Sequence, residues 1–326
     1  PPPPPPPSFF FHADDGIRDS STSRGLGDVY KRQAQNPVVQ PGSLAADLVR
    51  RDLTINAMAL DLISGEVIDP HGGQSDLAAG RLQFLHPGSI SDDPTRVIRA
   101  ARYGARLGID LGSEALEQVG ATVMAWPWAW QVGDAPETAP PALASRLRME
   151  LERLLDHEPW PIALDLLESW QAMALVDPCL QSDPERTRRL RWGHRLRLPL
   201  MTAMLAVVAD PGAVASRLQI PGQQQQWLER LPSLQAWLAS DPLPIQASPD
   251  AWTTALERGG WPPQTVALMV TLRPAAWRPL LRWWGRWRHI PSPQSARQLI
   301  AEGWQPGPGL GEELRRRRGV LLDQGR

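Results

Sequence analysis

The sequence predicts an α+β protein in which helices predominate. Two observations indicate this fold class. Residues 54–68 combine apolar residues with a central Ser-Gly pair, which is typical of a β-hairpin. Beyond residue 90, segments with apolar residues three and four positions apart alternate with proline and glycine, as in short helices. With 326 residues, 42% of them apolar, the chain is long enough for two or three domains with buried cores.

Residues 1–33 differ in composition from the rest of the chain. They contain the only lysine, Lys31, and three of the four phenylalanines, but none of the fifteen tryptophans. No apolar period of two or 3.6 runs through residues 8–33, and residues 14–33 are similar to translated sequencing-adapter read-through. We therefore interpret residues 1–33 as a non-native or disordered leader, with a native polyproline-II linker as the alternative. Their composition does not match a secretion signal.

The predicted elements follow in order along the chain. Residues 54–62 and 66–68 form the hairpin, with the turn at Ser64-Gly65, and residues 69–73 form a loop. A helix begins at Asp93-Pro94, as an N-cap and a first-turn proline, and ends at Leu107 before Gly108.

A further helix opens at Pro140-Pro141. It has an apolar stripe, with Arg146–Glu150 and Arg148–Glu152 pairs on its outside and leucines at 143, 147, 151 and 154. Residues 181–326 are expected to form a small helical array with most tryptophans packed inside.

The near-zero net charge conceals an asymmetry. Residues 34–180 carry ten arginines and twenty acidic residues, whereas residues 181–326 carry twenty arginines and eleven acidic residues. We expect only the second part to bind a polyanion, and a solvated basic surface is the alternative. No apolar run is long enough for a membrane span, so a cytoplasmic protein with no membrane partner is the simplest interpretation.

A polar ridge is expected near the start of the helix at residue 93. Asp93, Arg96, Arg99 and Arg102 step by three and therefore lie along one side. A carboxylate and a guanidinium together complement the edges of cytosine and adenine but not of uracil or guanine, and two further arginines can hold a triphosphate. The alternative is that Asp93 only caps the helix and the arginines form an exposed stripe.

A second polar group lies at the entry of the hairpin. If residues 52–56 are extended, Asp52, Thr54 and Asn56 share one face, where acid and amide groups can bind a ribose hydroxyl and Arg51 can reach a phosphate. A surface turn without ligand is the alternative.

Basic and aromatic residues alternate in residues 277–288, at a spacing that also fits a helix with tryptophans in the core. With the basic run at 315–318, this segment is a candidate RNA-backbone surface. Its candidate residues are Arg282, Arg286, Arg288, Arg315, Arg316, Arg317 and Arg318. The six histidines and the single cysteine, Cys179, have no metal-ligand spacing, so the sequence predicts no metal site.

Three blocks in this order and spacing resemble one known family. They are Asp47 to Ala59, containing Arg50-Arg51-Asp52; Ile68 to Gly73 with Asp76-Leu77; and Asp92-Asp93-Pro94-Thr95-Arg96-Val97-Ile98-Arg99-Ala100-Ala101-Arg102. The chain is thereby similar to the class II tRNA nucleotidyltransferase and poly(A) polymerase family, with a neck-like block at residues 145–155 and a tail-like loop at residues 303–311. The resemblance implies a nucleotidyltransferase head remnant in residues 34–90, a helical neck with a base-templating helix in residues 91–180, and a tRNA-binding body and tail in residues 181–326.

The resemblance also implies roles for individual residues. Arg51, Asp52 and Asn56 would bind the ribose and triphosphate of ATP or CTP; Asp93 and Arg96 would select the base, with Arg99 and Arg102 on the phosphates. Arg146, Arg148 and Glu150 would brace the templating helix. The partner would be the 3′ end of tRNA or another RNA, to which the enzyme adds C, A or both, and DNA is not expected.

One departure from the family concerns catalysis. The family begins with a glycine-rich segment and an Asp-x-Asp pair that holds two Mg²⁺ ions for phosphoryl transfer. Nothing in residues 34–49 supplies these carboxylates. We therefore expect a fragment that is inactive alone, with a non-catalytic RNA- and nucleotide-binding protein as the alternative and a helical interaction protein as a third hypothesis.

Overall fold

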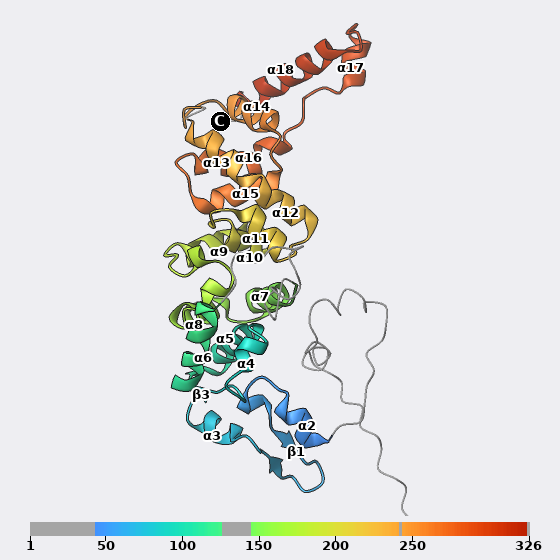
Figure 1. Ribbon diagram of the computed structural model, residues 1–326. Coiled ribbons are helices and arrows are strands. Elements are labelled where there is room, and N and C mark those ends of the chain that lie inside the picture. The colour runs from blue at the N-terminus through green and yellow to red at the C-terminus, as the bar shows by residue number, and fades with distance from the viewer. Residues whose placement is uncertain (1–42, 126–144, 241–242, 325–326) are drawn as a thin grey trace, which may run out of the picture. The chain divides into compact units, whose positions relative to one another are not determined.

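The computed structural model describes residues 43–125, 145–240 and 243–324 (Figure 1). The chain divides into two compact units, residues 1–143 and residues 144–326. The leader expected at residues 1–33 and the helix start expected at Pro140-Pro141 lie outside the described residues. In both units helices predominate, which confirms the predicted α+β, mainly helical fold class.

The first unit combines short helices with two small sheets. Its elements are α2 (Leu44–Val49), η1 (Thr54–Asn56), β1 (Ala59–Leu60), β2 (Val67–Ile68), α3 (Gly73–Ala78), β3 (Arg81–Leu82), α4 (Ser89–Asp92), α5 (Thr95–Leu107), β4 (Asp110–Leu111) and α6 (Ser113–Met124). Strands β1 and β2 are antiparallel, and Ala59 pairs with Ile68. Strands β3 and β4 are parallel, and Leu82 pairs with Leu111. The core of this unit lies under α5, where Val97, Ile98 and Ala101 are fully buried.

The hairpin forms, but its first strand is shorter than predicted. Gly65 adopts the left-handed conformation that the turn requires, with φ of 73°. The expectation of an extended chain from Thr54 was wrong, because residues 54–56 form a 3₁₀ turn. The Thr54 hydroxyl donates to Oδ2 of Asp76 at 2.7 Å, and this contact turns Thr54 away from the face expected for Asp52 and Asn56.

The hairpin tip carries exposed apolar side chains. Leu62 is 72% exposed and Ile63 is 95% exposed, and Val67 on β2 is 46% exposed. In the described part of the chain, β1 and β2 pair only with each other, so each keeps one open edge.

Helix α3 packs closely against η1. A Cβ atom at Gly73 would lie 2.4 Å from the carbonyl oxygen of Thr54, so only glycine permits this approach. Asp69, in the predicted loop at residues 69–73, stabilises the start of α3. Its carboxylate accepts hydrogen bonds from the backbone N–H groups of Gly73 at 2.8 Å and Gln74 at 2.9 Å. These hydrogen bonds lower the pKa of the Asp69 carboxyl.

The second unit is an array of short helices. They are α7 (Ser145–His157), α8 (Trp160–Ser169), η3 (Ala172–Leu175), η4 (Pro178–Leu180), α9 (Arg186–Arg195), α10 (Leu200–Leu205), α11 (Pro211–Arg217), α12 (Gly222–Glu229), α13 (Leu231–Ala239), α14 (Pro249–Gly259), α15 (Pro263–Leu272), α16 (Trp277–Gly285), η5 (Trp287–His289), α17 (Ala296–Ala301) and α18 (Pro308–Gln324). Helix α15 is the central element, because residues 265–271 are all buried and it packs against α9, α13 and α16. Helix α18 packs against α14.

The tryptophans in the described part of the chain differ in burial. Trp227, Trp252, Trp283 and Trp287 are buried, as predicted for the core, whereas Trp304 is 38% exposed. Trp192 and Trp277 are half-buried and contact each other edge to face, with ring centroids 6.1 Å apart. No helix in the described ranges combines the length and the apolar character needed to cross a membrane.

Candidate nucleotide site

Helix α5 carries the predicted polar ridge. Oδ1 of Asp93 accepts from the backbone N–H of Thr95 at 3.1 Å and from its hydroxyl at 2.6 Å, which is the capping contact predicted for this carboxylate. Gly108 ends the helix in the left-handed conformation, with φ of 70°, as predicted. The helix therefore fixes Asp93, which is only 7% exposed, at its start.

Asp52 is held at the entry of η1. Its Oδ1 atom accepts from the backbone N–H of Leu53 at 2.8 Å and from Nδ2 of Asn56 at 3.0 Å. Asp52 and Asn56 therefore do meet, as predicted, but through a short turn rather than across a strand face. Asp52 is 9% exposed, so its carboxylate is a buried charge that requires partners.

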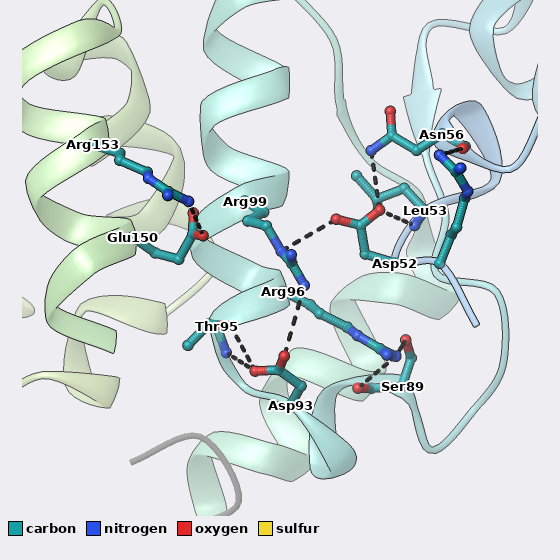
Figure 2. Close-up of polar contacts among 11 residues, drawn as sticks. Asp52, Leu53, Asn56, Ser89, Asp93, Thr95, Arg96, Arg99, Glu150 and Arg153 are labelled. Carbon is teal, nitrogen blue, oxygen red and sulfur yellow. Dashed lines mark hydrogen bonds and ion pairs between the residues drawn. The ribbon is translucent and has the colours of Figure 1, made fainter. Parts of the chain in front are cut away.

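Arg99 joins the two polar groups (Figure 2). Its Nε atom lies 3.2 Å from Oδ2 of Asp52, and its Nη2 atom lies 3.7 Å from Oδ2 of Asp93. The side chain of Arg99 is 14% exposed, so the ion pairs are largely shielded from water. Two motifs that lie far apart in the sequence thus form one buried cluster in the first unit.

Arg96 has an incompletely satisfied guanidinium. Its Nη1 atom donates to the carbonyl oxygen of Ser89 at 3.2 Å and to the Ser89 hydroxyl. Its Nε atom is buried and forms no hydrogen bond within the described ranges. Burial lowers the pKa of the Arg96 guanidinium, and the negative charge of Asp93 opposes this effect. A buried donor without an acceptor is costly, and a ligand acceptor would relieve that cost.

Tyr103 belongs to the same cluster, although the sequence motifs predicted no role for it. Burial and the negative charge of Asp52 raise the pKa of Tyr103, while hydrogen bonding to Asn56 opposes the shift. The guanidinium of Arg106 lies over its ring, 5.7 Å from the centroid. The signal was present in the sequence, because Tyr103 follows Arg99 by four residues and therefore lies on the same side of α5.

Besides Arg99, two arginines were expected at the phosphates, and they differ in exposure. The side chain of Arg51 is 42% exposed; its Nη2 atom lies 2.9 Å from Oδ2 of Asp47, and its Nη1 atom donates to the carbonyl oxygen of Asn56 at 3.3 Å. Arg102 is half-buried. The exposed guanidinium of Arg51 can exchange its carboxylate partner for a phosphate without opening the core.

The neck-like residues lie on α7 in the second unit. Arg148 pairs with Glu152 at 3.3 Å, as predicted. Glu150, which was expected on the outside of the helix, is 4% exposed and pairs with Arg153 at 3.1 Å. The prediction of an exposed position was therefore wrong for Glu150. Arg146 is half-buried, and its role as a brace remains a prediction.

The candidate RNA-binding arginines fall into two groups. Arg282, Arg286 and Arg315 are exposed and form no ion pair in the part of the chain that the structure describes. The others have internal partners: Arg288 donates to the Trp284 carbonyl at 2.6 Å, Arg316 and Arg317 pair with Glu313, and Arg318 contacts Glu257 through both nitrogens at 2.9 Å. The side chain of Arg318 is only 18% exposed, and its role in RNA binding remains a prediction.

Part of this sequence is similar to known proteins. The poly(A) polymerase head domain family model matches residues 11–83. A multifunctional CCA protein of Neisseria gonorrhoeae is 52% identical over 75 residues, covering 23% of this chain and 18% of the relative. A multifunctional CCA protein of Nitrosococcus oceani is 37% identical over 149 residues, covering 45% of this chain and 34% of the relative.

Solved structures of CCA-adding enzymes share the fold. The alignment with one apo form covers 88% of this chain and 69% of the chain of that enzyme, with a TM-score of 0.64 and 20% identity. The Thermotoga maritima enzyme in complex with tRNA covers 86% of this chain and 70% of its own, with a TM-score of 0.59 and 20% identity. At this identity the likeness shows the fold.

The mainly helical fold and these matches relate the chain to CCA-adding enzymes. Residues 11–83 match the poly(A) polymerase head domain, and the chain shares the fold of solved CCA-adding enzymes. It spans about a third or less of the length of the two curated relatives. The family-model match begins at residue 11 and therefore includes part of the segment interpreted above as a leader.

Proposed function

We propose that this chain recognises CTP or ATP for addition to the 3′ end of tRNA or a similar RNA. The observation that carries the proposal is the bridge from Arg99 to both Asp52 and Asp93. It brings the residue expected to bind the ribose and the residue expected to select the base into one cluster. In this arrangement Asp93 accepts a hydrogen bond from the exocyclic amine of cytosine or adenine. Arg96 donates to the ring nitrogen next to that amine.

The functions of related proteins support this proposal. CCA-adding enzymes of the same fold have been solved with CTP and with ATP, at TM-scores of 0.63. The curated relatives are multifunctional CCA proteins. The orphaned Nε atom of Arg96 supports the proposal independently, since an incoming base supplies the acceptor that the folded chain does not.

Metal-dependent transfer requires carboxylates that the described residues do not bring together. No group of three or more histidine, cysteine, aspartate or glutamate side chains in those residues could hold a metal ion. The two carboxylates of the cluster, of Asp52 and Asp93, already pair with Arg99. We therefore expect this chain by itself to bind nucleotide and RNA without transferring the nucleotide. We expect Mg²⁺ to be required by the complete enzymes that this chain resembles.

Thermal unfolding of the full chain with each of the four nucleoside triphosphates tests the proposal. CTP and ATP should raise the melting temperature more than UTP and GTP, because ligands that bind only the folded state stabilise it. Arg96→Gln should remove this difference between bases. Arg50→Gln is the matched control, because it removes an exposed arginine whose partner is Asp47. Equal protection by all four nucleotides would contradict base selection.

Primer extension separates the proposal from its alternative, a non-catalytic RNA- and nucleotide-binding protein. The full chain is incubated with Mg²⁺, CTP, ATP and a tRNA transcript that lacks its terminal A. Nucleotide protection without extension is the result expected for this chain alone. Extension would show that the residues outside the described ranges complete a catalytic site.

A further inference from the structure

Three arginines lie over two tryptophans in the second unit. Trp192 lies on α9, and Trp277 begins α16; their ring centroids are 6.1 Å apart. The guanidinium of Arg195 lies 5.5 Å from the Trp192 centroid, and those of Arg278 and Arg273 lie 4.9 Å and 5.9 Å from the Trp277 centroid. We call these five residues the arginine–tryptophan cluster.

The cluster has no neutralising carboxylates nearby in the sequence. No acidic residue occurs between Glu185 and Asp210, nor between Glu257 and Glu302, and these stretches contain α9, α15 and α16. Arg195, Arg273 and Arg278 are exposed and form no ion pair with any residue that the structure describes. By contrast, Arg316, Arg317 and Arg318 on α18 are neutralised by glutamates. Three of the four arginines in the basic run of α18 are thus neutralised, whereas none of the three arginines in the cluster is.

The position over an indole ring orders these guanidiniums before they bind phosphate. A guanidinium over an indole ring is held by its flat face, while its N–H groups lie in the guanidinium plane and point past the ring. The side chain is then already ordered, so less conformational entropy is lost when it donates to an anionic oxygen. Paired N–H donors of arginine match two phosphate oxygens.

Arg273 is one of four non-glycine residues with positive φ in the described chain. Arg273 follows α15 in the left-handed conformation, with φ of 56° and ψ of 52°, where glycine is usual. A non-glycine residue in this region carries a conformational cost. An arginine at this position keeps its guanidinium over Trp277 at that cost.

We propose that the arginine–tryptophan cluster binds the phosphodiester backbone of the RNA, which deepens and rests on the function proposed above. Three guanidiniums spread over two adjoining rings fit several phosphates along a strand better than one isolated phosphate. A lipid surface fits less well, because neither α9 nor α16 carries an exposed large apolar side chain that could insert among lipids.

Fluorescence anisotropy of a labelled tRNA transcript lacking its terminal A tests the proposal with the full chain. Arg195→Gln, Arg273→Gln and Arg278→Gln are combined in one variant. Its affinity should fall at least roughly tenfold, and the slope of log K against log salt should decrease by about 2 to 3, as expected for the loss of three phosphate contacts. The control combines Arg230→Gln, Arg258→Gln and Arg297→Gln, which removes the same charge from three exposed arginines outside the cluster.

A second variant separates binding from folding. Arg273→Gly removes the guanidinium but relieves the left-handed backbone, so its melting temperature should equal or exceed that of the unmodified chain while RNA affinity falls. Equal losses of affinity in the cluster and control variants would overturn the proposal. So would a cluster variant that loses binding to phosphatidylserine vesicles and keeps its RNA affinity.

Failure of this proposal is distinguishable from failure of the proposed function. If the unmodified chain does not bind the transcript, the cluster is not an RNA site. Protection by CTP and ATP would then still support the nucleotide site of the first unit, which is measured without RNA.

Discussion

The Nε atom of Arg99 lies 3.2 Å from Oδ2 of Asp52, and this ion pair joins the start of the hairpin segment to helix α5. The same guanidinium reaches Asp93 at 3.7 Å. One side chain therefore compensates two carboxylates whose residues are only 9% and 7% exposed. The geometry of the candidate nucleotide site depends on this arginine even where Arg99 itself does not touch a ligand.

Arg99→Met should destabilise the protein by about 3 kcal/mol, because it leaves two buried carboxylates without their shared cation. The free energy of unfolding, measured with urea, provides the check. Arg50→Met is the control: the Arg50 side chain is 52% exposed in its pair with Asp47, so its loss should cost about 0.5 kcal/mol or less. Similar values for the two variants would show that the buried bridge contributes little.

Exchanging the two residues expected to select the base, Asp93 and Arg96, should change the order of nucleotide preference. In a variant with Asp93→Arg and Arg96→Asp, donor and acceptor trade places, so protection by CTP and ATP should weaken relative to UTP and GTP. The ratio of the thermal shifts is measured, which makes the result independent of any general loss of stability. An unchanged order of the four nucleotides would rule out base selection by these side chains.

Gly73→Ala should destabilise the first unit by about 1–3 kcal/mol, because the new methyl group overlaps the Thr54 carbonyl oxygen, which belongs to the backbone and cannot swing aside. Gly120→Ala is the matched control in the interior of α6, where no neighbour lies within 4 Å of the new Cβ atom. It should stabilise the protein by about 0.5–1 kcal/mol. Differential scanning calorimetry of both variants measures the contrast in sign.

The stability of α18 should depend on pH through Glu313. Hydrogen bonds from Arg316 and Arg317 lower the pKa of the Glu313 carboxyl from 4.5 to about 2. A carboxyl with a lowered pKa stabilises the folded state above its unfolded pKa, and this contribution is lost as the pH falls from 4.5 toward about 2. Glu313→Gln should therefore lower the melting temperature at about pH 7, and the difference should vanish near pH 2.

Asp250 at the junction of α14 and α18 should behave in the opposite sense. Burial and the negative charge of Asp323 raise the pKa of the Asp250 carboxyl above 3.8. A raised carboxyl pKa favours folding at low pH, and this contribution is lost as the pH rises through the folded-state value. Asp250→Asn should therefore raise the melting temperature at about pH 7 but not below pH 3.8. A drop at neutral pH would show that the hydrogen bond to Thr254 outweighs the repulsion.

Local signals allowed part of this structure to be predicted. The Ser-Gly turn, the Asp93 cap and the Gly108 stop each act within a few residues, and all three are present. The 3₁₀ turn at Thr54 could not be predicted from local patterns, and the hydroxyl of Thr54 donates to Asp76, 22 residues away. Likewise, the pairing of Arg318 could not be predicted from local patterns, because its carboxylate partner Glu257 lies 61 residues away. The features that local patterns did not predict involve contacts between residues far apart in the sequence.

The exposed hairpin has a consequence for how the protein behaves in concentrated solution. Strands β1 and β2 each keep an open edge within the described chain, and Leu62 and Ile63 extend from the connecting tip into water. Open strand edges next to apolar side chains promote association between copies. The hairpin is therefore the segment to alter when the protein precipitates, and Ile63→Lys should raise its solubility limit, measured by light scattering, while nucleotide protection stays unchanged.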